Sequence, residues 1–198
     1  MNFDNCRIAF VAVGLIGILL FASPTIGLLI KPPPSEQHFS ELYVLGPNHM
    51  LGDIPFNIKQ GVTYSIYLGV VNQMGSSNYY TSLVKLGNDT QFLPNATLST
   101  PILLSTLFEY KSFISDEATW ETSLTFQVNQ LTFADNSAKL SSITINGVEF
   151  PVELTSVWNA DKTGYYNNLF VELWIFNSTI GASQYHNRFV SLNLNMTQ

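Results

Sequence analysis

The stretch VTYSIYLGVV, residues 62–71, decides how this chain is expected to fold. Its bulky apolar residues recur at every second position and share one face of an extended segment: Val62, Tyr64, Ile66, Leu68 and Val70. Most of the residues between them are small or polar and fall on the other face. A period of two is typical of a β-strand with one buried face, so the stretch predicts a strand.

The same alternation recurs from Phe39 onward, in residues 80–86, 122–130, 142–145, 148–154, 169–177 and 189–196. Between two of these runs, Asn146-Gly147 is a strong signal for a type I′ hairpin turn. Pro151 lies on the polar face of the second run, which predicts an edge strand or a bulge. Residues 106–115 fit either a short helix or an irregular crossover. Several strands separated by turns, without heptads or βαβ units, predict an all-β antiparallel sandwich.

An uncharged apolar run precedes the strands: IAFVAVGLIGILLFASPTIGLLI, residues 8–30, between Arg7 and Lys31. As a helix it would extend roughly 34 Å, enough to cross a hydrocarbon core of about 30 Å. The run therefore predicts a transmembrane helix whose partner is the lipid bilayer. The alternative is a cleaved signal peptide, for which Gly27 is the best cleavage position. Cutting there would leave an apolar new terminus, so the uncleaved anchor is favoured.

The chain is accordingly expected to have three parts. Residues 1–31 form an N-terminal tail and anchor (or signal peptide), residues 32–38 a proline-rich spacer, and residues 39–198 an extracytoplasmic β-sandwich domain. The expected location is the cell membrane, crossed once, with the C-terminal domain outside. Cys6 is the only cysteine, so disulfides cannot hold that domain together.

Composition and motifs argue against several functions. Charged residues make up only 11% of the chain, the net charge is −6, and the lysines are scattered, so nucleic acid is not an expected partner. The histidines lack metal-ligand spacing, and no nucleophile elbow, phosphate loop or dinucleotide fingerprint occurs. We therefore expect no enzymatic activity, cofactor or metal. Among four N-x-T sequons, Asn88 and Asn95 lie in a turn-like region and are the candidates for glycosylation.

The run 169–177 is apolar on both faces. One face is aliphatic, and the other carries Phe170, Trp174 and Phe176, interrupted only by Glu172. Such a strand is either covered by another element or offers a contact patch. We expect residues 93–121 to cover this face and to bury Trp174. If it is open, the three aromatic residues are the candidate contact patch.

Part of the sequence resembles a known family. The signature begins with FSELYVLGPN at residues 39–48 and continues with Gly52-Asp-Ile-Pro55 and Gly69-Val-Val-Asn72. It resembles an archaeal membrane-protein family known as domain of unknown function 1616, and Trp120-Glu121 matches a later pair in that family. The resemblance implies an immunoglobulin-like ectodomain on an archaeal cell surface and brings no catalytic residues. Each of these residues also suits a turn or strand, so we interpret the motif as a fold signature.

The expected function is that of a non-catalytic structural or assembly subunit of the archaeal cell envelope. Its expected partners are a surface-layer protein or another membrane protein. The alternative is a surface module that binds a glycan or another ligand through exposed aromatic residues, for which the candidates are Tyr79, Tyr165, Tyr166 and Trp174.

Overall fold

The computed structural model describes residues 11, 13, 14, 16, 38–90, 93–95 and 97–198. The chain divides into two compact units, Met1–Gln37 and His38–Gln198. The described residues of the first unit are helical. The remainder of the expected anchor, and the spacer up to residue 37, lie outside the described residues. Within the described part, no helix is both long and apolar enough to cross a bilayer.

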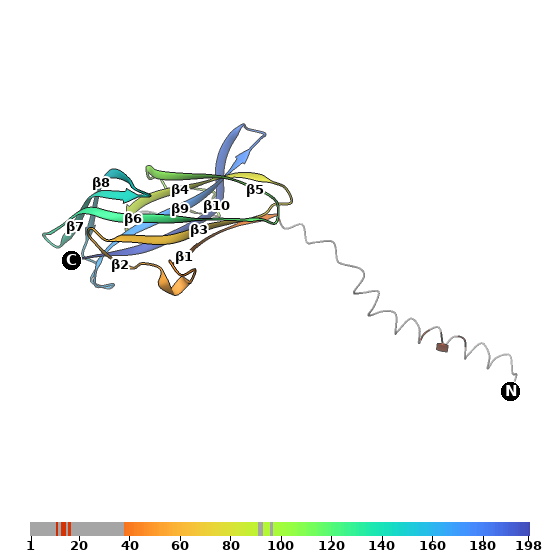
Figure 1. The fold of residues 1–198 in the computed structure, drawn as a ribbon, viewed down its shortest axis with the longest axis horizontal. Helices are drawn as coiled ribbons and strands as arrows, with labels where there is room; N and C mark the ends of the chain where they lie inside the picture. Colours follow the sequence, from red (N-terminus) through yellow and green to blue (C-terminus); the bar gives the residue numbers. More distant parts are fainter. Residues whose placement is uncertain (1–10, 12, 15, 17–37, 91–92, 96) are drawn as a thin grey trace. The chain divides into compact units, whose positions relative to one another are not determined.

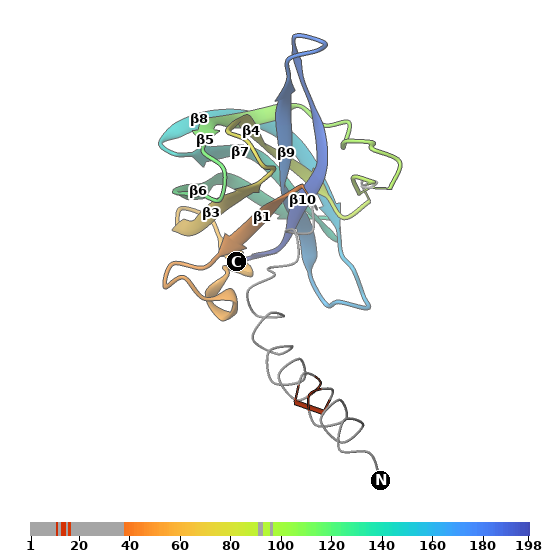
Figure 2. The ribbon, with the colours of Figure 1, turned by 90° about the vertical axis from the view of Figure 1, so that its right-hand side faces the viewer.

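The second unit consists of two five-stranded sheets (Figures 1 and 2). The first sheet has the order β1-β3-β6-β7-β8, and the second has the order β2-β10-β9-β4-β5. The strands are β1 (Phe39–Leu45), β2 (Asn57–Lys59), β3 (Thr63–Gln73), β4 (Asn78–Asn88), β5 (Thr106–Ile114), β6 (Thr119–Ala134), β7 (Ser137–Ile145), β8 (Val148–Val157), β9 (Tyr165–Asn177) and β10 (Ala182–Thr197). A short 3₁₀ helix, η1 (Leu51–Asp53), follows β1. The expected all-β architecture is confirmed.

Both sheets contribute side chains to one hydrophobic core. Ile66 and Leu68 of β3, predicted to face inward, are fully buried, as are Val84 of β4 and Val171 of β9 from the other sheet. All neighbouring strands pair antiparallel except β2, which pairs parallel with β10. The period of two therefore identified the inner face of β3 correctly except at Val62, which precedes the strand and is 42% exposed.

The hairpin between β7 and β8 follows the prediction. Asn146 and Gly147 both have positive φ, 49° and 79°, as a type I′ turn requires. Pro151 lies in β8, which is the end strand of its sheet, and the register between β7 and β8 shifts beside it, between Leu140 and Ser142. Both structural expectations for Pro151, an edge strand and a bulge, are confirmed.

Residues 106–115 form neither a helix nor an irregular crossover. All but the last of these residues form β5, which pairs antiparallel with β4 and ends the second sheet. Phe108 and Tyr110 pack against the core, and Ile114 is buried with Tyr80, so this strand also alternates. The expectation was wrong because both faces of the strand mix polar with apolar residues, which obscures the period of two in hydrophobicity.

The signature residues fill structural positions. Tyr43 of β1 pairs with Gly69 of β3, and a side chain at position 69 would collide with the Tyr43 ring. Asn72 is completely buried, and its amide nitrogen donates to the carbonyl oxygens of Ile114, Ser115 and Ser76. The motif therefore fixes how the end of β3 meets the β5–β6 connection.

Candidate functional site

Three exposed aromatic side chains lie in line on the outer face of the second sheet. Tyr79 of β4 pairs directly with Phe113 of β5. Where β4 pairs with β9, Tyr80 lies opposite Ile175. The next residue beyond this pair is Tyr79 on β4 and Phe176 on β9. The exposed fractions are 71% for Phe113, 42% for Phe176 and 37% for Tyr79. We call Phe113, Tyr79 and Phe176 the aromatic row.

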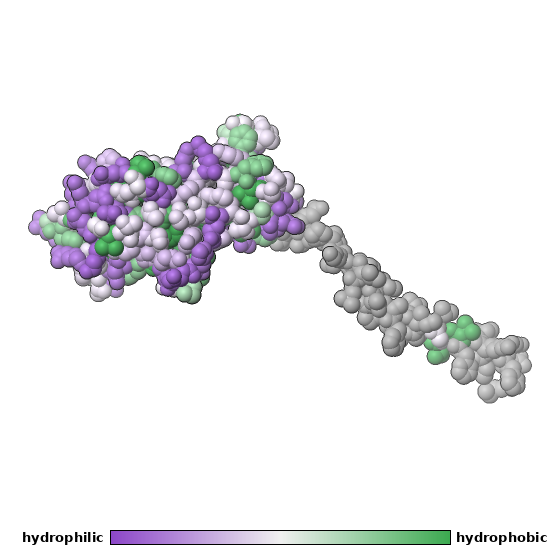
Figure 3. Space-filling model, viewed as in Figure 1, coloured by the Kyte–Doolittle hydropathy of each residue, from purple (hydrophilic) through white to green (hydrophobic). Residues whose placement is uncertain are grey.

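The local sequence explains why these side chains face outward. Each one precedes or follows a core residue in a strand: Tyr80 after Tyr79, Ile114 after Phe113, and Ile175 before Phe176. Because successive side chains in a strand point to opposite faces, burying these core residues turns the aromatic rings toward solvent. The row lies at the end of the domain where β1 begins, beside the β9–β10 hairpin. Figure 3 shows apolar surface on this projecting hairpin and next to it.

The three residues predicted for the contact patch differ in their exposure to solvent. Phe170 is completely buried, Trp174 is half-buried and Phe176 is exposed. Phe170 is therefore removed from the patch, and Tyr79 and Phe113 join Phe176. Phe113 was missed because its strand was not recognised. The cross-strand register that brings the three residues together is not visible in a single sequence.

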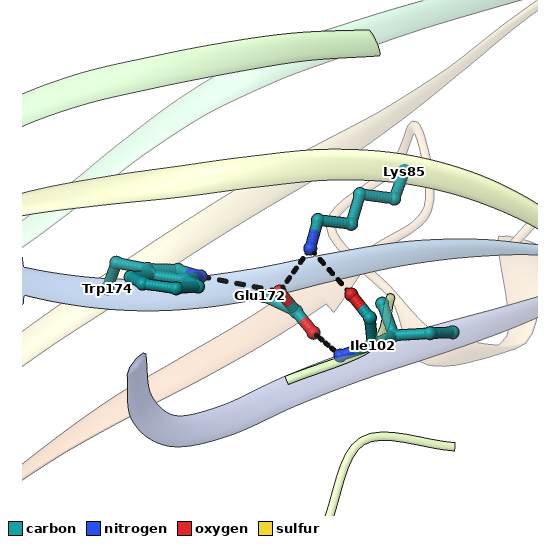
Figure 4. A network of polar contacts seen from close by, with 4 residues as sticks. All are labelled: Lys85, Ile102, Glu172 and Trp174. Carbon is teal, nitrogen blue, oxygen red and sulfur yellow. Dashed lines mark hydrogen bonds and ion pairs between the residues drawn. The ribbon is translucent and has the colours of Figure 1, made fainter. Parts of the chain in front are cut away.

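A buried ion pair lies on the outer face of the second sheet (Figure 4), and its lysine, Lys85, pairs across the strands with Phe170. Lys85 of β4 and Glu172 of β9 are joined by a 2.8 Å contact between Nζ and Oε2, and their side chains are 6% and 0% exposed. The Lys85 ammonium also donates to the carbonyl oxygen of Ile102, 3.0 Å away, while the Ile102 N–H donates to Glu172 Oε1. The ion pair thus holds the connection between β4 and β5 on the sheet.

This network explains why the Trp174 side chain is only half-buried. Its indole Nε1 donates to Glu172 Oε2 at 3.3 Å, and its ring lies 6.1 Å from the Tyr185 ring on β10. Residues 93–121 do reach this face, through Ile102, but they cover Glu172 and leave Trp174 half-buried. The expected full burial of Trp174 is wrong. Burial and the Glu172 carboxylate raise the pKa of the Tyr185 phenol to about 12, so this ring stays neutral beside the row.

A second polar cluster lies inside the same end of the domain. The Tyr80 hydroxyl lies 2.7 Å from Ser40 Oγ and donates to Asn72 Oδ1, and all three residues are fully buried. His186 Nε2 lies 3.0 Å from Ser40 Oγ, and burial together with the nearby Arg188 lowers the His186 pKa. A serine near a histidine is reminiscent of nucleophilic catalysis, but this serine is closed off from solvent and is already hydrogen-bonded to tyrosine.

The other predicted sites are dispersed. Asn88 is half-buried, and its amide nitrogen donates to the carbonyl oxygen of Thr155, whereas Asn95 is exposed in a short turn. Tyr165 lies at the opposite end of the domain from the row, and Tyr166 is buried. Within the described ranges, no group of three histidine, cysteine, aspartate or glutamate side chains is arranged to hold a metal ion.

The model of the family described as Domain of unknown function (DUF1616) matches residues 33–141, more than half of the chain. The matched region includes all of the signature from Phe39 to Asn72. No curated protein matches the chain.

Proposed function

The chain belongs to the Domain of unknown function (DUF1616) family, and from this premise we propose that it is a non-catalytic assembly subunit of an archaeal cell envelope. In this proposal, residues 8–30 anchor the chain in the cell membrane and the β domain lies outside the cell. The domain binds a neighbouring envelope protein, either a surface-layer protein or another membrane subunit. The aromatic row is the observation that carries the proposal.

The topology supports an immunoglobulin-like sandwich as the framework. The order β2-β10-β9-β4-β5, with β2 parallel to β10, corresponds to the sheet that holds the last two strands of an immunoglobulin domain. The first sheet departs from that pattern. In an immunoglobulin domain, the strand that directly precedes the last two strands of the chain lies at the position beside β3. Here that position is taken by β6, which is the first strand of a three-strand meander.

The row suits a protein partner for two reasons. Aromatic residues are enriched at protein interfaces and account for many binding hot spots, because they exclude water over a large area at low entropic cost. In addition, Phe113 belongs to the end strand β5, whose outer edge offers backbone donors and acceptors. A partner strand added at this edge would pair with β5 and at the same time contact the aromatic rings. The hydrocarbon core of a bilayer would leave those backbone groups without partners.

The internal polar groups support a binding role over a catalytic one. The Lys85–Glu172 pair and the Ser40–Tyr80–Asn72 cluster are buried, and their members bond to one another or to backbone groups. Saturated networks of this kind rigidify a domain. They present a stable surface to a partner, whereas catalysis requires a group that reaches a substrate.

Removing the row should abolish partner binding without unfolding the domain. We expect Phe113→Ala combined with Phe176→Ala to reduce co-purification of a stoichiometric envelope protein by at least about tenfold, because truncated hot-spot residues each cost more than about 1 kcal/mol. Each substitution should change the free energy of unfolding by no more than about 0.5 kcal/mol, because both side chains are substantially exposed. The measurement is quantitative affinity purification of the full-length chain from membranes of its own cells.

The matched control combines Leu51→Ala with Val157→Ala, two apolar residues that are 72% and 63% exposed outside the row. This control should retain the partner. Equal recovery of the partner by wild type, control and row variant would contradict the proposal.

A further inference from the structure

The end of the domain opposite the aromatic row contains a pocket of about 350 Å³ that is open to solvent. Its lining residues are Phe133, Trp158, Thr163, Gly164, Tyr165, Asn195, Met196, Thr197 and Gln198. They come from the end of β6, the turn between β8 and β9, the start of β9 and the end of β10. The volume falls at the small end of the range for small-molecule sites.

Three aromatic rings form the apolar part of the pocket. The Tyr165 ring lies 5.3 Å from the Phe133 ring and 5.1 Å from the Trp158 ring, between centroids. Trp158 remains 39% exposed although it contacts Tyr165. The pocket thus combines an accessible indole with two rings that are partly shielded from solvent.

The polar part of the pocket is held in place by the backbone. Asn195 Oδ1 accepts from the Tyr165 N–H, and Asn195 Nδ2 donates to Asn57 Oδ1 at 2.9 Å. Gly164 makes this possible, because any side chain at that position would run into the Asn195 amide. Two backbone hydrogen bonds between Asn159 and Gly164 close the adjoining turn. A pocket with fixed walls binds a ligand at a lower entropic cost.

The chemistry of the walls selects the ligand. No lining side chain is charged at neutral pH, so these side chains offer no counter-charge to an anion or a cation. Aromatic rings pack against the C–H faces of a sugar ring, while amide, hydroxyl and backbone groups bond its hydroxyls. We propose that this pocket binds a neutral saccharide unit, at a site separate from the protein-binding row. This proposal of saccharide binding does not depend on the proposed assembly function.

The test is calorimetric titration of the full-length chain, in a detergent that has no sugar headgroup, with maltoheptaose, cellohexaose and chitohexaose. We expect saturable binding of at least one of the three oligosaccharides. Trp158→Ala should weaken it by at least about tenfold, because the exposed indole is lost. Thr163→Lys, on the exposed turn at the rim, should weaken it similarly by adding bulk and charge, and it leaves the core intact.

Phe113→Ala is the matched control, since it truncates an exposed aromatic residue of the row. It should leave saccharide affinity unchanged within about twofold, so failure of the two proposals can be told apart. Absence of saturable binding for all three oligosaccharides would overturn the inference. Saccharide binding that Trp158→Ala and Thr163→Lys both leave intact would also overturn it. The same holds if the chain binds octanol, a purely apolar probe, and does not bind the saccharides.

Discussion

Replacing Lys85 with methionine is expected to lower the free energy of unfolding by about 3–5 kcal/mol. Methionine keeps an apolar side chain of similar length but removes the ammonium group that lies 2.8 Å from Glu172. The Glu172 carboxylate would then remain completely buried, with the Ile102 N–H and the Trp174 indole as its described donors. A buried carboxylate without a counter-charge is costly because the protein interior solvates it poorly. Urea denaturation followed by circular dichroism measures the loss.

Lys111→Met provides the matched control. Lys111 also pairs with a glutamate, Glu109, at 2.8 Å, but the two side chains are 54% and 50% exposed. Solvent screens such a pair, so its loss should leave the urea midpoint unchanged within experimental error. If Lys85→Met were no more destabilising than Lys111→Met, the buried pair would not hold the β4–β5 connection on the sheet.

The second large effect is expected at Asn72. Asn72→Ala should lower the free energy of unfolding by about 3 kcal/mol or more, because each buried polar group left without a partner costs about 1–3 kcal/mol. The Asn72 amide nitrogen donates to three backbone carbonyls, and its oxygen accepts from the Met74 N–H and the Tyr80 hydroxyl. Alanine would remove all five of these hydrogen bonds at a position that is completely buried.

The same denaturation experiment measures this change, with Asn177→Ala as the control. Asn177 also makes an amide hydrogen bond, to Gln184 at 3.3 Å, but it lies at the base of an exposed hairpin. We expect it to cost no more than about 0.5 kcal/mol. Similar losses at both positions would mean that the signature asparagine is not an organising element of the fold.

Local patterns in the sequence predicted much of the fold. The alternation in residues 62–71, the Asn146-Gly147 turn and the placement of Pro151 are local signals, and each is confirmed. Two strands were missed for physical reasons. In β5, charged and aromatic residues share one face, and β2 has only three residues, which is too short to display a period.

The candidate site was harder to predict because it depends on contacts distant in sequence. The alternation showed that the face of Phe170 was either covered or a contact patch, and coverage by residues 93–121 was the favoured interpretation. Its burial goes together with the pairing of Glu172 with Lys85, which lies 87 positions earlier in the chain. The single acidic residue within an aromatic face was the available signal, since a charge at such a position requires a partner when it is buried. Nothing in the sequence pointed to Lys85 as that partner.

In the proposed function, the domain lies outside the membrane and binds a protein through the aromatic row. The most direct test is cysteine cross-linking on intact cells with a membrane-impermeant reagent that joins cysteine to amines. The chains compared carry Phe113→Cys or Val157→Cys, both with Cys6→Ser so that the introduced thiol is the only one. Position 113 lies in the row, and position 157 is an exposed site at the other end of the domain.

We expect both thiols to react on intact cells, and only position 113 to yield a covalent adduct with one envelope protein of defined mass. Reaction of both thiols only after lysis would contradict the extracytoplasmic location. Reaction of both thiols on intact cells, with no adduct at position 113 or with the same adduct from position 157, would contradict the aromatic row as the binding surface.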